Sequence, residues 1–200
     1  MIYLYVEDEL SEAVALKILG FIEQEENRCF GHKKAFTKKG YGDIKRNIRK
    51  YNEIAKYNPV LVLVDLDNTD CAPSKMSEFI DFPKNRNFIF RIAVREVEAW
   101  LFADRKNFAE YLGVAIARIP MQPEEIDDPK QFLFNIARRS KKKAIREDIP
   151  PEPESKARIG KNYNGRLKEF VWKHWDVQIA RETLLRKSLD KAIMAISSLN

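Results

Sequence analysis

Several kinds of residue are scarce in this sequence, and each shortage excludes a class of site. The 200 residues include only two cysteines, Cys29 and Cys71, and only two histidines. Two cysteines give no disulfide framework, which indicates a reducing compartment, so we expect a cytoplasmic protein. Structural zinc needs four such ligands, usually in close pairs, so the sequence argues against zinc. With two histidines, no Ser-His-Asp set can be argued either.

Glycine clusters and long apolar runs are also missing. The seven glycines are scattered, and none belongs to a G-x-x-x-x-G-K-[ST] phosphate loop, so ATP hydrolysis would need a partner protein. The longest apolar runs, such as residues 60–64, are far shorter than the roughly 20 residues that a helix needs to cross a bilayer. We therefore expect no membrane partner.

What the sequence does contain is an alternation of strands and helices. Hydrophobic residues make up 44% of the chain, which fits a folded protein. The patterns predict strands over 2–6, 28–30, 60–64 and 88–94, a loop over 31–42, and helices over 13–22 with Ser11 as N-cap, 43–55, 75–79, 96–103 and 104–112 with Asp104 as cap. This order predicts an α/β fold with an open, mostly parallel sheet, in which the apolar run 60–64 is a central strand.

The composition changes after Gly113. Prolines punctuate residues 120–129 and 150–153, a helix is predicted from 129 into 138–143, and helical patterns fill the C-terminus. We therefore predict an α/β domain over 1–113 and a helical C-terminal extension over 114–200 that packs on it as one unit.

Acidic side chains follow two of the predicted strands directly. Glu7 comes after the first strand, and Asp65 and Asp67 come at the end of the central one. In open α/β sheets this carboxyl edge is where ligands bind, and clustered carboxylates favour Mg²⁺ (or Mn²⁺). Alternation would place Asp65 and Asp67 on the same side if the strand continues. The alternative is structural, with these acids serving as loop and helix caps.

Three families place acids in this way. The segment 64–69 resembles the first motif of haloacid-dehalogenase-type phosphatases, which implies Asp65 as nucleophile, although that motif normally lies on the first strand. Glu7 and Asp8 with Asp65 also resemble a response-regulator receiver, in which the acids bind metal and Asp65 accepts phosphate. The spacing of the acids is long for a receiver, and no later strand lysine is evident.

The third resemblance covers more of the chain. Val6-Glu7, Asp65-x-Asp67 and the segment 91–104 resemble the TOPRIM fold, and in particular a bacterial TOPRIM-like domain-of-unknown-function family, number 4276, related to the overcoming-lysogenization-defect (OLD) nucleases. Members are often found beside ATPase partners, some in phage-defence settings. TOPRIM proteins usually carry glycine after the glutamate, where this chain has Asp8, so the geometry there departs from the pattern.

The TOPRIM resemblance implies a set of site residues. Glu7 would be acid/base and metal ligand, Asp65 and Asp67 would bind Mg²⁺, and Glu98 would assist in preference to Glu96. By the same resemblance Lys161 would stabilise charge on the scissile phosphate. A solvated surface lysine is an equally good interpretation of Lys161.

The positive charge is uneven along the chain, although the net charge is only +6. Two stretches, near 33–50 and 138–146, are strongly basic, and phosphate backbones favour such stretches. The predicted nucleic-acid-binding residues are Lys45, Arg46, Arg49, Lys50, Arg138, Arg139, Lys141 and Lys142.

The expected function is therefore Mg²⁺-dependent cleavage of phosphodiester bonds, as the effector of an anti-phage defence system with an ATPase partner. A non-catalytic binding or sensor module on the same scaffold is the main alternative, and a phosphatase is the next. A homo-oligomer is an arrangement that the sequence leaves open.

Overall fold

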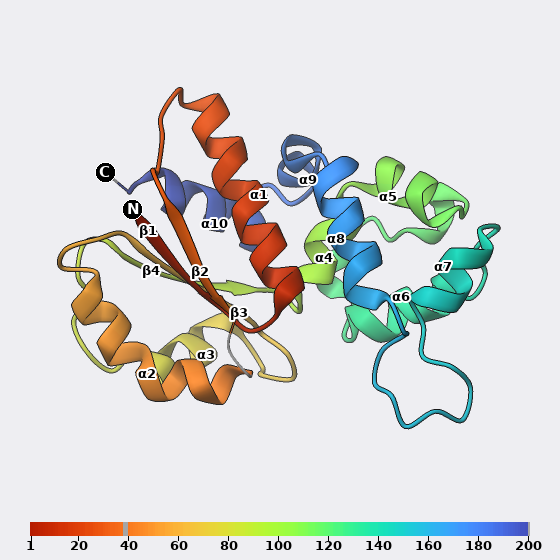
Figure 1. The fold of residues 1–200 in the computed structure, drawn as a ribbon, viewed down its shortest axis with the longest axis horizontal. Helices are drawn as coiled ribbons and strands as arrows, with labels where there is room; N and C mark the ends of the chain where they lie inside the picture. The colour runs from red at the N-terminus through yellow and green to blue at the C-terminus, as the bar shows by residue number, and fades with distance from the viewer. Residues whose placement is uncertain (38–39, 200) are drawn as a thin grey trace.

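A computed structural model of the chain describes residues 1–37 and 40–199. Figure 1 shows a small sheet with helices on both faces and a helical region beside it. The elements are β1 (Ile2–Val6), α1 (Glu9–Glu25), β2 (Lys33–Thr37), α2 (Tyr41–Ile54), β3 (Val60–Asp65), α3 (Ala72–Phe79), β4 (Phe88–Ala93), α4 (Val97–Ala103), α5 (Arg105–Leu112), the 3-10 turns η1 (Ile116–Arg118) and η2 (Pro123–Glu125), α6 (Pro129–Ala137), α7 (Lys143–Asp148), α8 (Tyr163–Lys173), α9 (Val177–Thr183) and α10 (Ser188–Ser197).

The sheet is open and all four described strands are parallel, which confirms the predicted α/β class. The strand order is β2-β1-β3-β4, so β3 lies inside the sheet, as its continuous apolar run predicts. Every residue of β3 is buried. Because β1 and β3 are parallel neighbours, the side chains that follow them meet at the same edge.

Each face of the sheet has its own apolar core, because alternate strand residues point to opposite faces. One core combines Leu61, Leu63 and their neighbours with α1 and α10. The other combines Val60, Val62 and Val64 with α2 and α3. The last helix of the chain thus packs directly against β4, and residues of the C-terminal part share one continuous core with β1 and α1.

The region from α4 to α9 lies beyond the carboxyl ends of the strands (Figure 1). Residues 114–199 therefore both cover a face of the sheet, through α10, and adjoin its carboxyl edge. Among the described helices, none has both the length and the apolar character that crossing a membrane requires.

Three local predictions are wrong. The strand predicted over 28–30 lies instead at Lys33–Thr37, inside the segment predicted as a loop. Lys34 and Thr37 of this edge strand are exposed and Lys33 pairs with Glu23, so polar residues disguise its β pattern. Positions 38 and 39 of the predicted loop lie outside the described residues.

Ser11 is not the cap of α1, because the carboxylate of Asp8 accepts a hydrogen bond from the Ser11 N–H at 2.8 Å and caps the helix. The helix predicted into 138–143 ends at Ala137, and a separate helix begins at Lys143.

Candidate functional site

Glu7 and Asp65 meet at the carboxyl edge of the sheet. Glu7 directly follows β1, and Asp65 is the last residue of β3. Oε1 of Glu7 accepts a hydrogen bond from the backbone N–H of Asp65 at 3.1 Å. The convergence of these two acids, predicted from the strand order, is therefore present in the structure.

Asp65 connects this edge of the sheet to the start of α4, the helix that follows β4. Its side chain is 7% exposed, and Oδ1 accepts a hydrogen bond from the backbone N–H of Val97, the first residue of α4, at 3.0 Å. Burial, followed by the nearby charges of Glu98, Asp8 and Glu7, holds the pKa of Asp65 well above its usual value. The start of α4 is thus fixed to the end of β3 by a carboxylate that is costly to ionise.

Two further acids belong to the start of α4, and both contact one lysine. The ammonium of Lys130, on the first turn of α6, lies 3.3 Å from Oε1 of Glu96 and 3.6 Å from Oε1 of Glu98. The backbone N–H of Lys130 also donates to Oε2 of Glu96 at 3.1 Å. Glu98 is 1% exposed and accepts a short hydrogen bond from the hydroxyl of Tyr163, at the start of α8. We call Glu7, Asp65, Glu96 and Glu98, with Lys130 and Tyr163, the carboxylate cluster.

One buried carboxylate oxygen of the cluster has no hydrogen-bond donor among the described residues. Oε2 of Glu98 is buried and accepts no hydrogen bond from any described residue. A buried oxygen without a donor is unusual, and it is one sign of a missing ion, water or ligand.

The electrostatics of the cluster are dominated by desolvation. Burial, then the charge of Asp67, raises the pKa of Glu7 to about 7. Burial, then the charge of Glu98, raises the pKa of Glu96 to about 7. Burial also raises the pKa of Glu98, although Lys130 and Tyr163 oppose the shift. Burial lowers the pKa of Lys130, but the charges of Glu98 and Glu96 outweigh that effect and raise it. One ammonium therefore interacts with three carboxyl groups, those of Glu96, Glu98 and Asp65, that are each harder to ionise than usual.

β3 ends at Asp65 and Asp67 has a left-handed φ of 51°, so the strand alternation that would pair these two side chains does not extend to Asp67. Its Oδ2 lies 3.0 Å from the ammonium of Lys75, a side chain on α3 that is 3% exposed as a residue. That ammonium also donates to the backbone oxygen of Leu66 at 3.1 Å. Asp67 therefore has its own buried counterion, and the condition for the predicted Asp65–Asp67 pair is not met.

Lys161 lies outside the described contacts of the carboxylate cluster. Its side chain is 58% exposed, and its ammonium is 3.9 Å from Oδ1 of Asp148. The turn that carries it is held by hydrogen bonds from the N–H of Gly160 to the oxygen of Ile149 and from the N–H of Asn162 to the oxygen of Asp148. The cation in the cluster is Lys130, which nothing in the sequence distinguishes among 36 lysines and arginines.

Tyr163 could have been found from the sequence. It stands two residues after Lys161, which is itself a predicted site residue. Burial, then the neighbouring Glu98, raises the pKa of its phenol well above the usual value, so the hydroxyl remains a hydrogen-bond donor.

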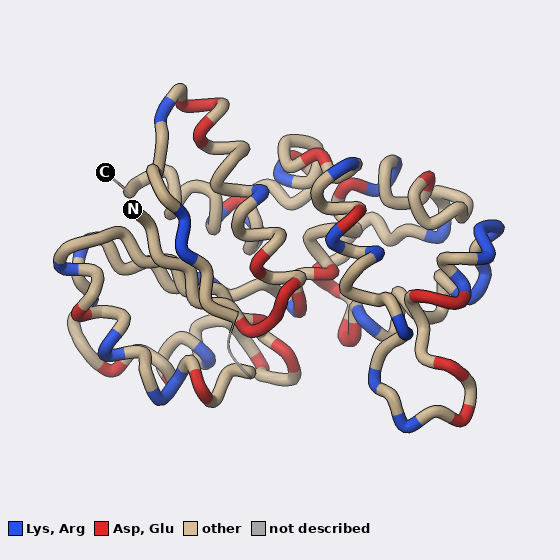
Figure 2. Tube along the Cα trace, in the orientation of Figure 1, with Lys and Arg blue, Asp and Glu red and all other residues tan. Residues whose placement is uncertain are grey.

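The predicted nucleic-acid-binding residues lie on two separate regions. Figure 2 shows one basic group along α2 and another around α7, at opposite ends of the molecule, with the acidic turn after β1 between them. On α2, Lys45, Arg46 and Arg49 form ion pairs with Glu78, Asp43 and Asp81, respectively, whereas Lys50 has no ion pair with any described residue. The second group, Arg138, Arg139, Lys141 and Lys142, is exposed.

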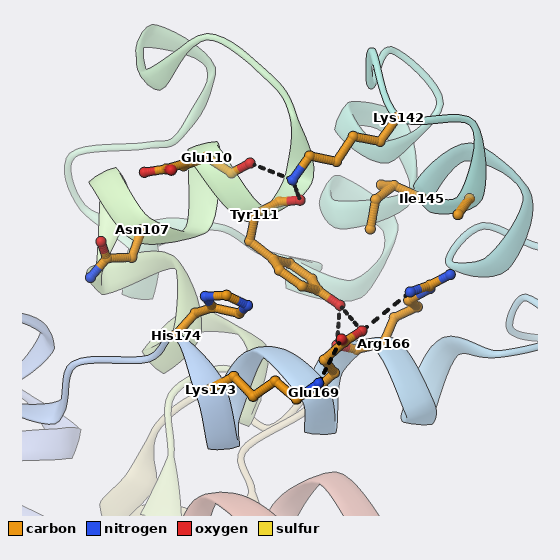
Figure 3. Close-up of a pocket in the computed structure, with 10 residues that line it drawn as sticks. Asn107, Glu110, Tyr111, Lys142, Ile145, Arg166, Glu169, Lys173 and His174 are labelled. Carbon is orange, nitrogen blue, oxygen red and sulfur yellow. Dashed lines mark hydrogen bonds and ion pairs between the residues drawn. The ribbon is translucent and has the colours of Figure 1, made fainter.

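Lys142 has a structural contact that the sequence does not predict. Its ammonium donates to the backbone oxygens of Glu110 and Tyr111, both at 2.9 Å, in the last turn of α5. Figure 3 shows this contact on one side of an open pocket of about 550 Å³, with Arg166 and His174 of the α8 segment opposite. Lys142 thus stabilises the C-terminal end of a helix, where free carbonyls attract cations.

The donor set of the carboxylate cluster suits a hard divalent cation, because its ligands are carboxylate oxygens and one of them is orphaned. As the side chains stand within residues 1–37 and 40–199, no group of three or more His, Cys, Asp or Glu residues is arranged so that it could hold a metal ion. Glu96 and Glu98 are instead joined through Lys130.

The fold and the site define an α/β protein with an open parallel sheet and a buried carboxylate cluster at its carboxyl edge. The model of a protein family described as "Domain of unknown function (DUF4276)" matches residues 6–168, and the chain belongs to this family. No curated protein and no solved structure matches it.

Proposed function

We propose that the protein is a nuclease of the TOPRIM type that cleaves phosphodiester bonds with the help of Mg²⁺ or Mn²⁺. The observation that carries the proposal is the convergence of Glu7, Asp65 and Glu98, from the segments after β1, at the end of β3 and after β4, at one edge of a parallel sheet. Ligands of open α/β sheets bind at this edge.

The chemistry of these residues fits a divalent cation. Glu7, Asp65 and Glu98 would hold it, and the orphaned oxygen of Glu98 supplies an acceptor that no described residue uses. Because no three acids are arranged to hold an ion as they stand, binding requires some of these side chains to rotate. When bound, the metal would activate water and neutralise the leaving oxygen.

Lys130 and Tyr163 would position the site, and Glu7 would also carry a proton there. Lys130 and Tyr163 hold the carboxylate of Glu98 from two sides. Glu7, with a pKa of about 7, exchanges a proton near neutral pH at its carboxylate, which suits a general acid or base. Asp67 is held by Lys75 in the loop after β3, and its charge acts on Glu7.

The decisive experiment compares cleavage of labelled single- and double-stranded DNA and RNA by the wild-type protein and by Asp65→Asn. Asparagine keeps an oxygen that can accept the hydrogen bond from Val97, so this variant should fold. We expect metal-dependent cleavage that EDTA abolishes and that Asp65→Asn loses at least about a hundredfold. Glu147→Gln, a change of an exposed acid, is the matched control. Undiminished cleavage by Asp65→Asn would refute the assignment.

The partner part of the proposal rests on the sequence. The chain has no phosphate loop, so an ATPase partner would supply ATP hydrolysis in a defence system. The purified protein should accordingly show no ATPase activity on its own. An ATPase activity that co-purifies with the protein and is lost in Asp65→Asn would contradict the need for an ATPase partner.

A second candidate is a binding or sensor module without catalysis. It is favoured by the way Lys130 and Tyr163 already satisfy one oxygen of Glu98, which leaves the acids bridged rather than open. Calorimetric titration with Mg²⁺ and Mn²⁺ separates the two candidates. Binding of nucleic acid without binding of either metal would favour the module.

A further inference from the structure

A second pocket lies on the opposite side of β4 from the centre of the sheet and shares no residue with the carboxylate cluster. It has a volume of about 420 Å³, and its walls come from α3, from the end of β4 and from the segment that begins α10. The apolar wall consists of Ala72, Pro73, Met76, Ile92 and Val94. Pockets of this size hold small organic molecules.

Arg91 is the most unusual residue of this pocket. It lies on β4, which is an edge strand, and it is half-buried. Its Nε is buried and donates no hydrogen bond to any described residue, and no described carboxylate lies within ion-pair distance of its guanidinium. Burial lowers the pKa of Arg91 without an opposing acid. A buried N–H without an acceptor is destabilising, so the fold keeps Nε of Arg91 unpaired at a free-energy cost.

The other polar residues add to the positive charge. Arg186, Lys187 and Lys191 also line the pocket, and none of them forms an ion pair with a described residue. One carboxylate, that of Glu124, faces them, and its Oε1 already accepts hydrogen bonds from the N–H and the hydroxyl of Ser188 at 2.8 and 2.5 Å. Four cations thus surround an apolar hollow that contains one acid, Glu124, which is hydrogen-bonded to Ser188 of the same pocket and offsets part of the positive charge through Lys187 and Lys191.

We propose that this pocket binds a small organic acid, in which a carboxylate, sulfonate or phosphate group is attached to an apolar body. The anionic group would accept hydrogen bonds from the guanidinium of Arg91, and the apolar body would lie on Met76 and Val94. A charge-assisted hydrogen bond to a buried guanidinium is stronger than a neutral one, and Arg91 offers donors that no described residue takes. The site is independent of the proposed nuclease activity.

A pair of fluorescent probes tests the proposal with the full-length protein. The probe 1-anilinonaphthalene-8-sulfonate carries an apolar body and a sulfonate, and N-phenyl-1-naphthylamine is its neutral counterpart. We expect saturable, single-site binding of the sulfonate by wild-type protein at low salt, and much weaker binding of the neutral probe. Equal affinity for both probes, or no binding of either at millimolar concentration, would overturn the proposal.

Two variants locate the binding. Arg91→Met should lower the affinity for the sulfonate about tenfold or more, because it removes a charged hydrogen-bond donor. It should fold at least as stably as the wild type, since it removes an unpartnered buried charge. Lys191→Met changes an exposed residue of α10, so it keeps the fold, and it should lower the affinity roughly threefold. Arg118→Met, at an exposed arginine outside the pocket, is the control with the same change of charge. Wild-type affinity in both Arg91→Met and Lys191→Met would refute this location.

Discussion

Oε1 of Glu7 accepts a hydrogen bond from the backbone N–H of Asp65 at 3.1 Å, across 58 positions of sequence. The contact joins the ends of two neighbouring parallel strands through a side chain rather than through the sheet itself. It fixes one oxygen of Glu7 and leaves the carboxyl group close to other acids, which is why its ionisation has consequences for stability.

The free energy of unfolding of the metal-free protein should fall as pH rises from about 5 to about 8. Burial and the charge of Asp67 raise the pKa of Glu7 from 4.5 to about 7, so over this interval the unfolded chain loses a proton that the folded one keeps. The loss attributable to Glu7 is at most roughly 3 kcal/mol. Urea unfolding in EDTA at several pH values measures it, with Glu7→Gln for comparison. Parallel pH profiles in the two proteins would contradict the prediction.

Replacement of Lys130 by Met should destabilise the protein by about 3–5 kcal/mol, because it leaves Glu96 and the buried Glu98 without their cation. The double variant Lys130→Met/Glu98→Gln should recover part of that loss, since glutamine can still accept the hydrogen bond from Tyr163. Chemical unfolding of the four proteins of this cycle gives the coupling free energy. Lys141→Met, at an exposed lysine without an ion pair to a described residue, is the matched control and should change stability little.

Substitution of Gly160 by Ala should destabilise the protein by about 2 kcal/mol or more. A Cβ at this position would lie 2.3–2.6 Å from the backbone oxygens of Asp148, Ile149 and Pro150, and these atoms cannot move without breaking the turn that leads to Tyr163. Gly20→Ala is the control, since Gly20 lies within α1 with no atom within 4 Å of the added carbon. It should stabilise by about 0.5–1 kcal/mol. Thermal unfolding distinguishes the two, and equal effects would be evidence against this packing.

Mn²⁺ should raise the thermal unfolding temperature of the wild-type protein, because a ligand that binds only the folded state stabilises it. The shift should vanish in Asp65→Asn and persist in Asp67→Asn measured against its own metal-free baseline, since Asp67 is paired with Lys75. Differential scanning fluorimetry with increasing metal concentration provides the measurement. Loss of the shift in Asp67→Asn alone would move the metal site to the loop after β3.

The sheet could be predicted from the sequence because β1 and residues 60–64 of β3 are continuous apolar runs and β4 is apolar apart from Arg91. The meeting of Glu7 and Asp65 follows from the parallel pairing of β1 and β3. The edge strand at Lys33–Thr37 could not, because its polar residues belong to the solvent-facing edge of the fold. The pairing of Asp67 with Asp65 stays a prediction whose premise fails, because alternation holds only while the strand continues, and β3 ends at Asp65 before the left-handed Asp67. Lys130 joins the cluster through the packing of α6, which leaves no local pattern in the sequence, whereas Tyr163 stands only two residues after the predicted Lys161.

The position of α10 determines when one face of the sheet can be covered during synthesis of the chain. β1 precedes every other described element in the chain, and one face of its sheet shares a core with α10, which follows all of them. During synthesis the apolar residues of that face near β4 therefore remain uncovered until residues 188–197 have emerged, although the opposite face can already pack against α2 and α3. A nascent chain thus carries a sheet that is incompletely covered near β4 until α10 has emerged, and a chain that lacks α10 would expose this part of the face permanently.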